Sequence, residues 1–230
     1  GTKNLSREPA MTREQAVSGI LTGIELAAQA KHDGVSILGV GEMGIGNTTT
    51  SSAVLSALTG ASVEEVTGRG GGLTDEAFRK KKHVIEHALA LHKPDKNDPI
   101  DVLSKVGGFD LCAMTGVFLG AAIERIPVVV DGFISIVAAL CASRLAPSAK
   151  AYFIGSHRSF EIGYRLAETE LGLHPCLELG MRLGEGSGCP IAFRVVEAAC
   201  AVMCTMATFP EAAINDEYLT DIRAKDSFTV

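Results

Sequence analysis

The sequence predicts an α/β fold: a Rossmann-like parallel sheet flanked by helices, with a small helical subdomain. Short β-branched segments alternate with longer helical patterns, and such alternation builds parallel sheets through right-handed crossovers. A glycine-rich turn at 39–46 directly follows the first β-branched segment. The 230 residues, of which 47% are hydrophobic, are enough to bury a sizeable core. We therefore expect one domain over residues 1–230, whose N-terminal and C-terminal helices form a helical appendage.

The first half of the chain is expected to hold one strand among three helices. In order, the elements are a helix from Thr12 to about His32, a strand at 35–40, a helix at 50–58 and a helix from Thr74 to about Leu91. Thr12-Arg-Glu-Gln15 is a capping box, and Thr74 is a second N-cap residue. Pro94 ends the last of these helices, since proline cannot continue the helical hydrogen bonds.

The second half is expected to supply three more strands and their crossover helices. The elements are a short helix near residue 100, strands at 109–113, 126–130 and 151–154, helices at 114–125 and 133–145, and a long apolar helix from Pro190 to about Phe209. Ligands bind at the carboxyl ends of the strands in such sheets. The loops after Val40, Ala113, Val130 and Ile154 should therefore share one rim.

Composition excludes several classes of function. The net charge of −6 argues against a nucleic-acid surface, and the one basic cluster, Arg79–Lys82, is typical of a solvated helix face. The longest apolar runs are interrupted by Asp131, Arg125 or Arg144, which predicts no membrane span. The chain opens without a signal-peptide pattern or an initiating methionine, which indicates a processed or partial chain.

The six cysteines form no CxxC pair and have apolar neighbours. We expect them to be reduced core residues of a cytoplasmic protein, with neither a disulfide framework nor a metal site. Cys200 and Cys204, four residues apart on a predicted helix, are expected to belong to a core stripe.

The glycine turn at 39–46 is the strongest local signal for ligand binding. Gly39-Val-Gly-Glu-Met-Gly44 matches GxGxxG, but Glu64 and Glu65 follow a loop and are badly placed to hold a ribose. No lysine of a P-loop follows the glycines. Backbone N–H groups and the oxygens of Asn47 and Thr48–Thr50, which also suit helix capping, remain to hold an anion. This combination favours a nucleotide monophosphate.

Two further glycine loops complete the predicted site. Gly68-Arg-Gly-Gly-Gly72 offers consecutive N–H groups that can form an anion nest. Gly184-Glu-Gly-Ser-Gly188 carries a carboxylate between glycines, and we expect it to face the turn at 39–46 across one site. Read alone, Glu185 is more simply an exposed turn residue.

Together, five motifs resemble the nicotinate-nucleotide–dimethylbenzimidazole phosphoribosyltransferase family, which helps assemble the lower ligand of cobalamin. They are Gly41-Glu-Met-Gly-Ile-Gly-Asn-Thr-Thr49, Gly68–Thr74, Pro127–Ser135, Ser156–Ser159 and Leu179-Gly-Met-Arg-Leu-Gly-Glu-Gly-Ser-Gly188. The resemblance implies transfer of phosphoribosyl from nicotinate mononucleotide to 5,6-dimethylbenzimidazole, giving α-ribazole 5′-phosphate and nicotinate. It also implies a homodimer and no cofactor.

The resemblance places the general base at Glu185 and an acidic residue near the ribosyl group at Glu42. For Glu42, hydrogen bonding within its own loop is an equal alternative. The substrate-binding residues that it implies are Gly44, Gly46, Asn47, Thr48, Gly70, Gly71, Gly72, Lys81, Ser159 and Leu183. Lys81 is nearly as well explained as a solvated lysine. Asp131 and His157 share the rim, as site residues or as a structural turn aspartate and a capping histidine.

Three departures from the family pattern limit what carries over. Gly71 stands where the family usually has threonine, and Phe160-Glu-Ile-Gly-Tyr164 replaces the usual Ala-Glu-Pro-Gly-His. The resemblance also implies a further segment in family members, about a third of a domain, ahead of the position of Gly1. That segment supplies much of the acceptor pocket, so we expect part of this pocket to be missing from the 230-residue chain. Two hypotheses follow: an active transferase, or an inactive nucleotide-binding module that partners a complete paralogue. An oxidoreductase is a distant third.

Overall fold

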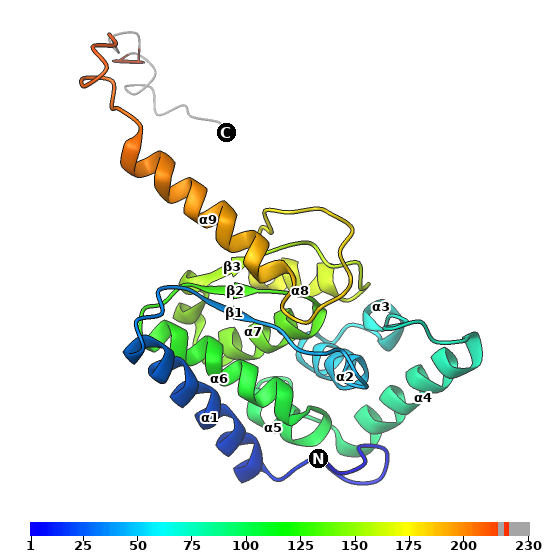
Figure 1. The fold of residues 1–230 in the computed structure, drawn as a ribbon. Helices are drawn as coiled ribbons and strands as arrows, with labels where there is room; N and C mark the ends of the chain where they lie inside the picture. Colours follow the sequence, from blue (N-terminus) through cyan, green and yellow to red (C-terminus); the bar gives the residue numbers. More distant parts are fainter. Residues whose placement is uncertain (216–218, 221–230) are drawn as a thin grey trace. The chain divides into compact units, whose positions relative to one another are not determined.

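The computed structural model describes residues 1–215 and 219–220, and the chain divides into two compact units (Figure 1). The first unit, Gly1–Phe193, contains the sheet and the predicted site. The second, Arg194–Val230, continues the last helix, α9 (Gly188–Thr205). Within the described residues, α9 is the one helix long and apolar enough to cross a membrane, with a mean hydropathy of 1.4. The sequence predicted no such helix, because charged residues interrupt the longest apolar runs. Length and hydropathy alone are weak evidence for a membrane span, because core helices of soluble proteins can share both.

The sheet has three parallel strands in the order β1–β2–β3: β1 (Leu38–Val40), β2 (Val128–Val130) and β3 (Phe153–Gly155). Val40 pairs with Val130, and Val130 pairs with Gly155, so all three strands end at one edge. This register confirms the shared rim for three of the four predicted loops.

The described part of the chain contains nine α-helices and one 3-10 segment. They are α1 (Arg13–His32), α2 (Thr48–Thr59), α3 (Val63–Val66), α4 (Asp75–His92), α5 (Pro99–Val106), α6 (Phe109–Ile123), α7 (Phe133–Leu145), η1 (Pro147–Tyr152), α8 (Tyr164–Leu171) and α9. The Thr12 capping box and the Thr74 cap are both present. Asn47 precedes α2, but its side chain makes no capping hydrogen bond, so its predicted capping role is wrong.

The predicted strand at 109–113 is wrong, because these residues form the first turns of α6. A short apolar run does not by itself distinguish a buried strand from a buried helix. The segment packs closely against α1: a Cβ on Gly19 of α1 would lie 2.9 Å from the Cβ of Cys112. A glycine in α1 thus lets the start of α6 approach it closely.

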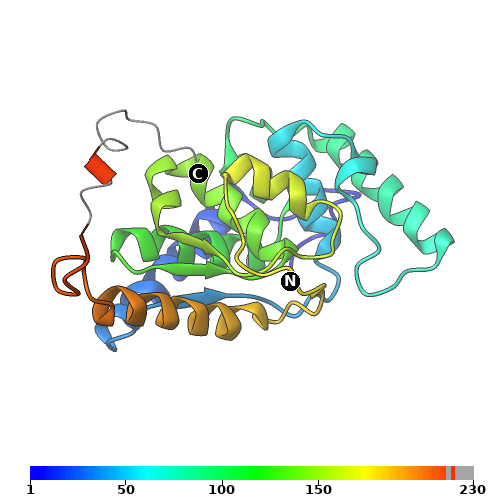
Figure 2. The same cartoon turned by 90° about the horizontal axis from the view of Figure 1, so that it is seen from above.

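Helices α6 and α7 lie against the face of the sheet that carries Val128 and Val130 (Figure 1). On the opposite face, Val129 packs against Cys189 and Ala192 from the start of α9. Seen from above, α3 and α4 lie beyond α2, on the side away from the sheet (Figure 2). All six cysteines are free, but Cys176, Cys200 and Cys204 are exposed, which corrects the prediction that all six are core residues.

Candidate active site

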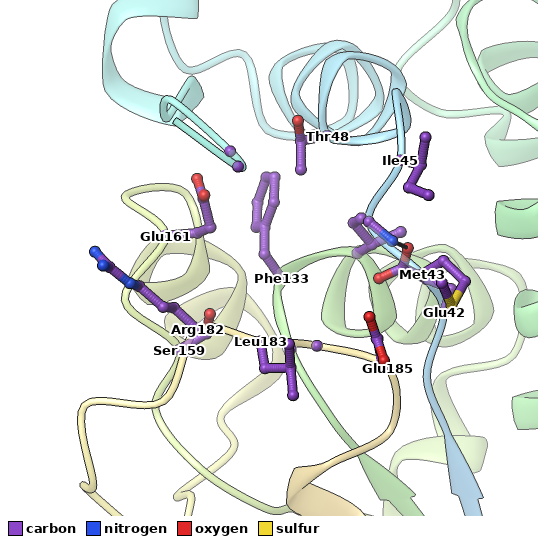
Figure 3. Close-up of a pocket in the computed structure, with 16 residues that line it drawn as sticks. Glu42, Met43, Ile45, Thr48, Phe133, Ser159, Glu161, Arg182, Leu183 and Glu185 are labelled. Atoms are coloured by element: carbon purple, nitrogen blue, oxygen red, sulfur yellow. Dashed lines mark hydrogen bonds between the residues drawn. The ribbon is translucent and has the colours of Figure 1, made fainter. Parts of the chain in front are cut away.

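A pocket of about 350 Å³ opens at the rim where the three strands end (Figure 3). Its lining comes from the segments that follow β1, β2 and β3 and from two downstream glycine loops. Eight of the predicted site residues line it: Glu42, Gly44, Thr48, Gly70, Gly71, Ser159, Leu183 and Glu185. The other four, Gly46, Asn47, Gly72 and Lys81, do not line it.

The loops that carry Glu42 and Glu185 meet backbone to backbone. A Cβ on Gly41 would lie 2.2 Å from the Gly186 nitrogen, so only glycine permits this approach. The Glu185 N–H donates to the Glu42 carbonyl oxygen at 2.7 Å. The contact confirms the expectation that these two loops face one site.

The Glu185 loop is held by a buried aspartate at the end of β2. Asp131, 1% exposed, accepts hydrogen bonds from the Gly186 N–H at 3.0 Å and the Gly188 N–H at 2.7 Å. Glu185 itself adopts a left-handed conformation with φ of 58°. Such a conformation costs a non-glycine residue about 1–2 kcal/mol, so external hydrogen bonds are needed to maintain it. Asp131 therefore has a loop-anchoring role that its position in the sequence did not indicate.

The neighbouring histidine is a structural residue. His157 is 1% exposed, and its Nδ1 lies 3.0 Å from Ser156 Oγ and 3.8 Å from Asp131 Oδ1. Burial lowers the pKa of His157, although the Asp131 carboxylate opposes the shift. His157 does not line the pocket. The structure therefore favours a structural role, in which the His157 ring packs beside the Asp131 carboxylate, over contact with a ligand.

Glu42 is half-buried and bound by donors on its own loop. Its Oε2 accepts hydrogen bonds from the Gly44 N–H and, at 2.6 Å, from Asn47 Nδ2. The same Asn47 nitrogen donates to Asp110 Oδ2 at 2.8 Å, so Asn47 lies behind Glu42 as a bridge between two carboxylates. Burial raises the pKa of Glu42, the two hydrogen bonds oppose the shift, and the Asp110 and Asp131 charges add to it.

Glu42→Gln should change how the stability of the chain depends on pH. A raised folded-state pKa means that the folded chain holds the Glu42 proton more tightly than the unfolded chain does. This contribution to stability is fully present below the ordinary pKa of 4.5 and is lost as the pH rises through the folded pKa. In urea unfolding measured from below pH 4.5 to above the folded pKa, the midpoint of the parent should contain this loss of stability, and the midpoint of Glu42→Gln should not. Glu86→Gln, an exposed control on α4, should keep the parental pH profile.

Thr48 lines the pocket, and its side chain is hydrogen-bonded to Lys81. Lys81 is 7% exposed, and its Nζ donates to Thr48 Oγ1 and to the Gly68 carbonyl oxygen, both at 2.9 Å. Because the Thr48 oxygen accepts from Lys81, its own proton is free to point into the pocket. Burial lowers the pKa of Lys81, and the Glu161 carboxylate opposes the shift. Lys81 is therefore a buried residue behind the pocket wall, and its alternative explanation as a solvated lysine is wrong.

Several lining residues were not singled out from the sequence. They are Met43, Ile45, Gly132, Phe133, Ile134, Glu161, Arg182 and Gly184. Figure 3 shows Phe133 between the Thr48 wall and Leu183, with Glu161 and Arg182 on one side and Glu42 and Glu185 on the other. The motifs at 127–135 and 179–188 did contain Phe133 and Arg182. Their presence in those motifs was the sequence feature that could have identified them as pocket residues.

The parallel sheet and the pocket at the carboxyl ends of its strands define an α/β protein with its ligand site where Rossmann-like enzymes have theirs. The phosphoribosyltransferase family matches residues 1–214. The chain belongs to this family, which confirms the resemblance.

Relatives in this family are named for one reaction. A nicotinate-nucleotide–dimethylbenzimidazole phosphoribosyltransferase of Clostridium perfringens is 57% identical over all 230 residues of the chain. A Clostridium tetani enzyme of the same name is 50% identical over 226 residues, 98% of the chain and 62% of that protein. The crystal structure of CobT from Thermus thermophilus has a TM-score of 0.89 at 40% identity, covering 94% of this chain and 64% of that chain. The chain also spans 64% of the length of the Clostridium perfringens relative.

Proposed function

We propose that the chain transfers phosphoribosyl from nicotinate mononucleotide to 5,6-dimethylbenzimidazole, giving α-ribazole 5′-phosphate and nicotinate. The observation that carries the proposal is one pocket lined by the carboxylates of Glu42 and Glu185 and by Thr48, Gly70 and Gly71. Carboxylates suit proton removal and stabilisation of positive charge, and hydroxyl and backbone donors suit a phosphate. Relatives named for this reaction are 50–57% identical.

The phosphate is assigned to the wall formed by the start of α2 and the 68–72 loop. Thr48 begins α2, and the first N–H groups of a helix attract anions. Gly70 lies next to Thr48, since a Cβ on Gly70 would be 3.0 Å from Thr48 Oγ1. Ser159, which is 8% exposed, contributes a hydroxyl from the segment after β3. Lys81 adds positive charge behind Thr48.

The aromatic acceptor is assigned to the apolar side chains beside the two carboxylates. Met43, Ile45 and Leu183 line the pocket and are 62%, 80% and 65% exposed. Large apolar groups exposed around a pocket gain free energy when a flat aromatic ligand covers them. The acceptor then lies next to Glu185, within reach of the proton that it must lose.

The reaction itself is a displacement at the ribosyl carbon. One ring nitrogen of the azole attacks that carbon while Glu185 removes the proton from the other nitrogen. The bond between the ribosyl carbon and the pyridinium nitrogen breaks, and its electron pair returns to the pyridine ring as nicotinate leaves. Glu42 stabilises the positive charge that develops at the ribosyl carbon.

The proposal is tested on this chain by a calorimetric titration with nicotinate mononucleotide. Dimethylbenzimidazole is then added, and released nicotinate is measured. Binding followed by nicotinate release is expected. Binding without release would favour the alternative of an inactive nucleotide-binding module, and no binding would contradict both.

Lys81→Met should weaken phosphate recognition. Removing a charged donor next to Thr48 is expected to lower the affinity for nicotinate mononucleotide roughly 10- to 100-fold, the range for a charged hydrogen bond. Affinity for nicotinate riboside, which lacks the phosphate, should stay near the parental value. Lys80→Met, an exposed neighbour on α4, is the matched control. Equal losses with both ligands would contradict the assignment of Lys81 to the phosphate.

We also propose that the chain forms a cytoplasmic homodimer. Leu21 and Leu26 of α1 and Ile123 of α6 are 51%, 57% and 65% exposed, and such apolar residues favour burial against a second copy. The body of α6 is mostly buried, so the proposed interface lies at the end of α6 and along α1. Sedimentation velocity of the parent and of Leu26→Glu tests the proposal. The six free cysteines are compatible with a reducing compartment.

A further inference from the structure

Arg182 is the one cationic side chain that lines the pocket in the described part of the chain. The other charged lining residues, Glu42, Glu161 and Glu185, are all carboxylates. Lys81 stays behind the wall, hydrogen-bonded to Thr48 and Gly68. Within the described residues, the Arg182 guanidinium has no ion-pair or hydrogen-bond partner, so its charge is available to a ligand.

The Arg182 side chain is oriented without being neutralised. Its guanidinium carbon lies 5.9 Å from the centroid of the Phe160 ring, in a cation–π contact that holds the side chain and leaves its donors free. The backbone supports this placement, since the Phe160 N–H donates to the Met181 carbonyl oxygen at 3.3 Å. A bridge between His157 and Leu177 continues the pairing of the two segments. An oriented, unpaired arginine suits a planar anion such as a carboxylate.

The position of Arg182 relative to Glu185 indicates which anion it meets. Figure 3 shows the two side chains on opposite sides of the pocket, with Leu183 between them. In a displacement that inverts the ribosyl carbon, the leaving group departs from the face opposite the attacking nitrogen. If the attacking base lies beside Glu185, the departing ring lies on the side of Arg182. The leaving ring, nicotinate, carries a carboxylate.

We propose that Arg182 binds the carboxylate of the departing nicotinate ring and thereby selects nicotinate over nicotinamide nucleotides; this inference rests on the proposed function. Before the displacement the nicotinate ring is a zwitterion, with a pyridinium nitrogen and a carboxylate. After the bond breaks the nitrogen is neutral and the ring carries a net negative charge. The attraction to Arg182 therefore grows as the reaction proceeds, and this kind of binding accelerates a chemical step.

Arg182→Gln tests the inference through binding as well as turnover. Calorimetry should show that the variant binds nicotinate roughly 10- to 100-fold more weakly than the parent, the range for loss of a charged hydrogen bond. Binding of nicotinamide should change little, because an amide presents no charge to the guanidinium. In turnover, the parent's preference for nicotinate mononucleotide over nicotinamide mononucleotide should fall by a similar factor. Arg182→Lys keeps the charge but loses the planar guanidinium, so it should retain part of the parent's preference for nicotinate mononucleotide.

Arg165→Gln, an exposed arginine on α8, is the matched control and should behave as the parent. Unchanged nicotinate binding in Arg182→Gln would overturn the inference, and so would equal losses for nicotinate and nicotinamide. A loss of ribose 5-phosphate binding with nicotinate binding intact would reassign Arg182 to the phosphate and also overturn it. Failure of the parent to release nicotinate would contradict the proposed function alone, because the two ligand affinities still test Arg182.

Discussion

Glu185→Gln is expected to lower turnover by about 10²- to 10⁴-fold, the contribution typical of a general base. Glutamine has nearly the same shape but does not accept the azole proton. The backbone of the Glu185 loop should persist, because the Asp131 hydrogen bonds go to Gly186 and Gly188 and not to the glutamate side chain. Affinity for nicotinate mononucleotide should therefore remain near the parental value. Single-turnover nicotinate release and a calorimetric titration measure the two quantities separately.

A second variant distinguishes proton removal from simple negative charge. Glu185→Asp keeps a carboxylate but shortens its reach by one methylene, so it should lose activity and retain a pH dependence that Glu185→Gln lacks. Equal turnover in the parent and in Glu185→Gln would contradict the assignment of the base.

Asp131→Asn is expected to destabilise the fold and to lower turnover together. Asparagine has one acceptor oxygen, so its NH₂ group would face one of the two N–H donors of the Glu185 loop. An unsatisfied buried polar group costs about 1–3 kcal/mol, and the loop would shift to relieve it. Urea unfolding should report the loss of stability, and turnover should fall even under conditions in which the variant is fully folded.

The matched control for this variant is Asp33→Asn, an exposed aspartate just after α1. Asp33→Asn should change neither the free energy of unfolding nor the turnover appreciably. If Asp131→Asn were destabilised but turned over at the parental rate, the Asp131 anchor would matter for folding and not for the position of Glu185.

The rim of the sheet could be predicted because it depends on local patterns. Short apolar segments end at Val40 and Val130, and parallel strands bring such ends to one edge. The 109–113 segment was misassigned because its apolar residues fit a buried strand as well as a buried helix. What decided between them was packing against α1, a contact between residues roughly 90 positions apart that no local pattern encodes.

Some parts of the candidate site likewise follow from local motifs, whereas others depend on contacts between distant residues. Glu42 and Glu185 stand in glycine-rich motifs and were found from the sequence, whereas the tie from Asp131 to Gly188 joins residues 57 positions apart. The position of Lys81 behind Thr48 likewise follows only from how α4 packs against α2. Arg182 lay within a recognised motif, but its unpaired charge became evident only when the surrounding carboxylates were in place.

The left-handed conformation of Glu185 sets activity and stability against each other. Gly184 and Gly186 on either side have φ of 74° and 72°, so the backbone here passes through three consecutive positions that glycine occupies most readily. Relief of the local strain alone would favour glycine at the middle position as well, and that glycine would remove the carboxylate to which the proposed reaction assigns the azole proton. The carboxylate is thus kept against the conformational preference of its own backbone. Engineering this loop for thermal resistance should begin at other positions.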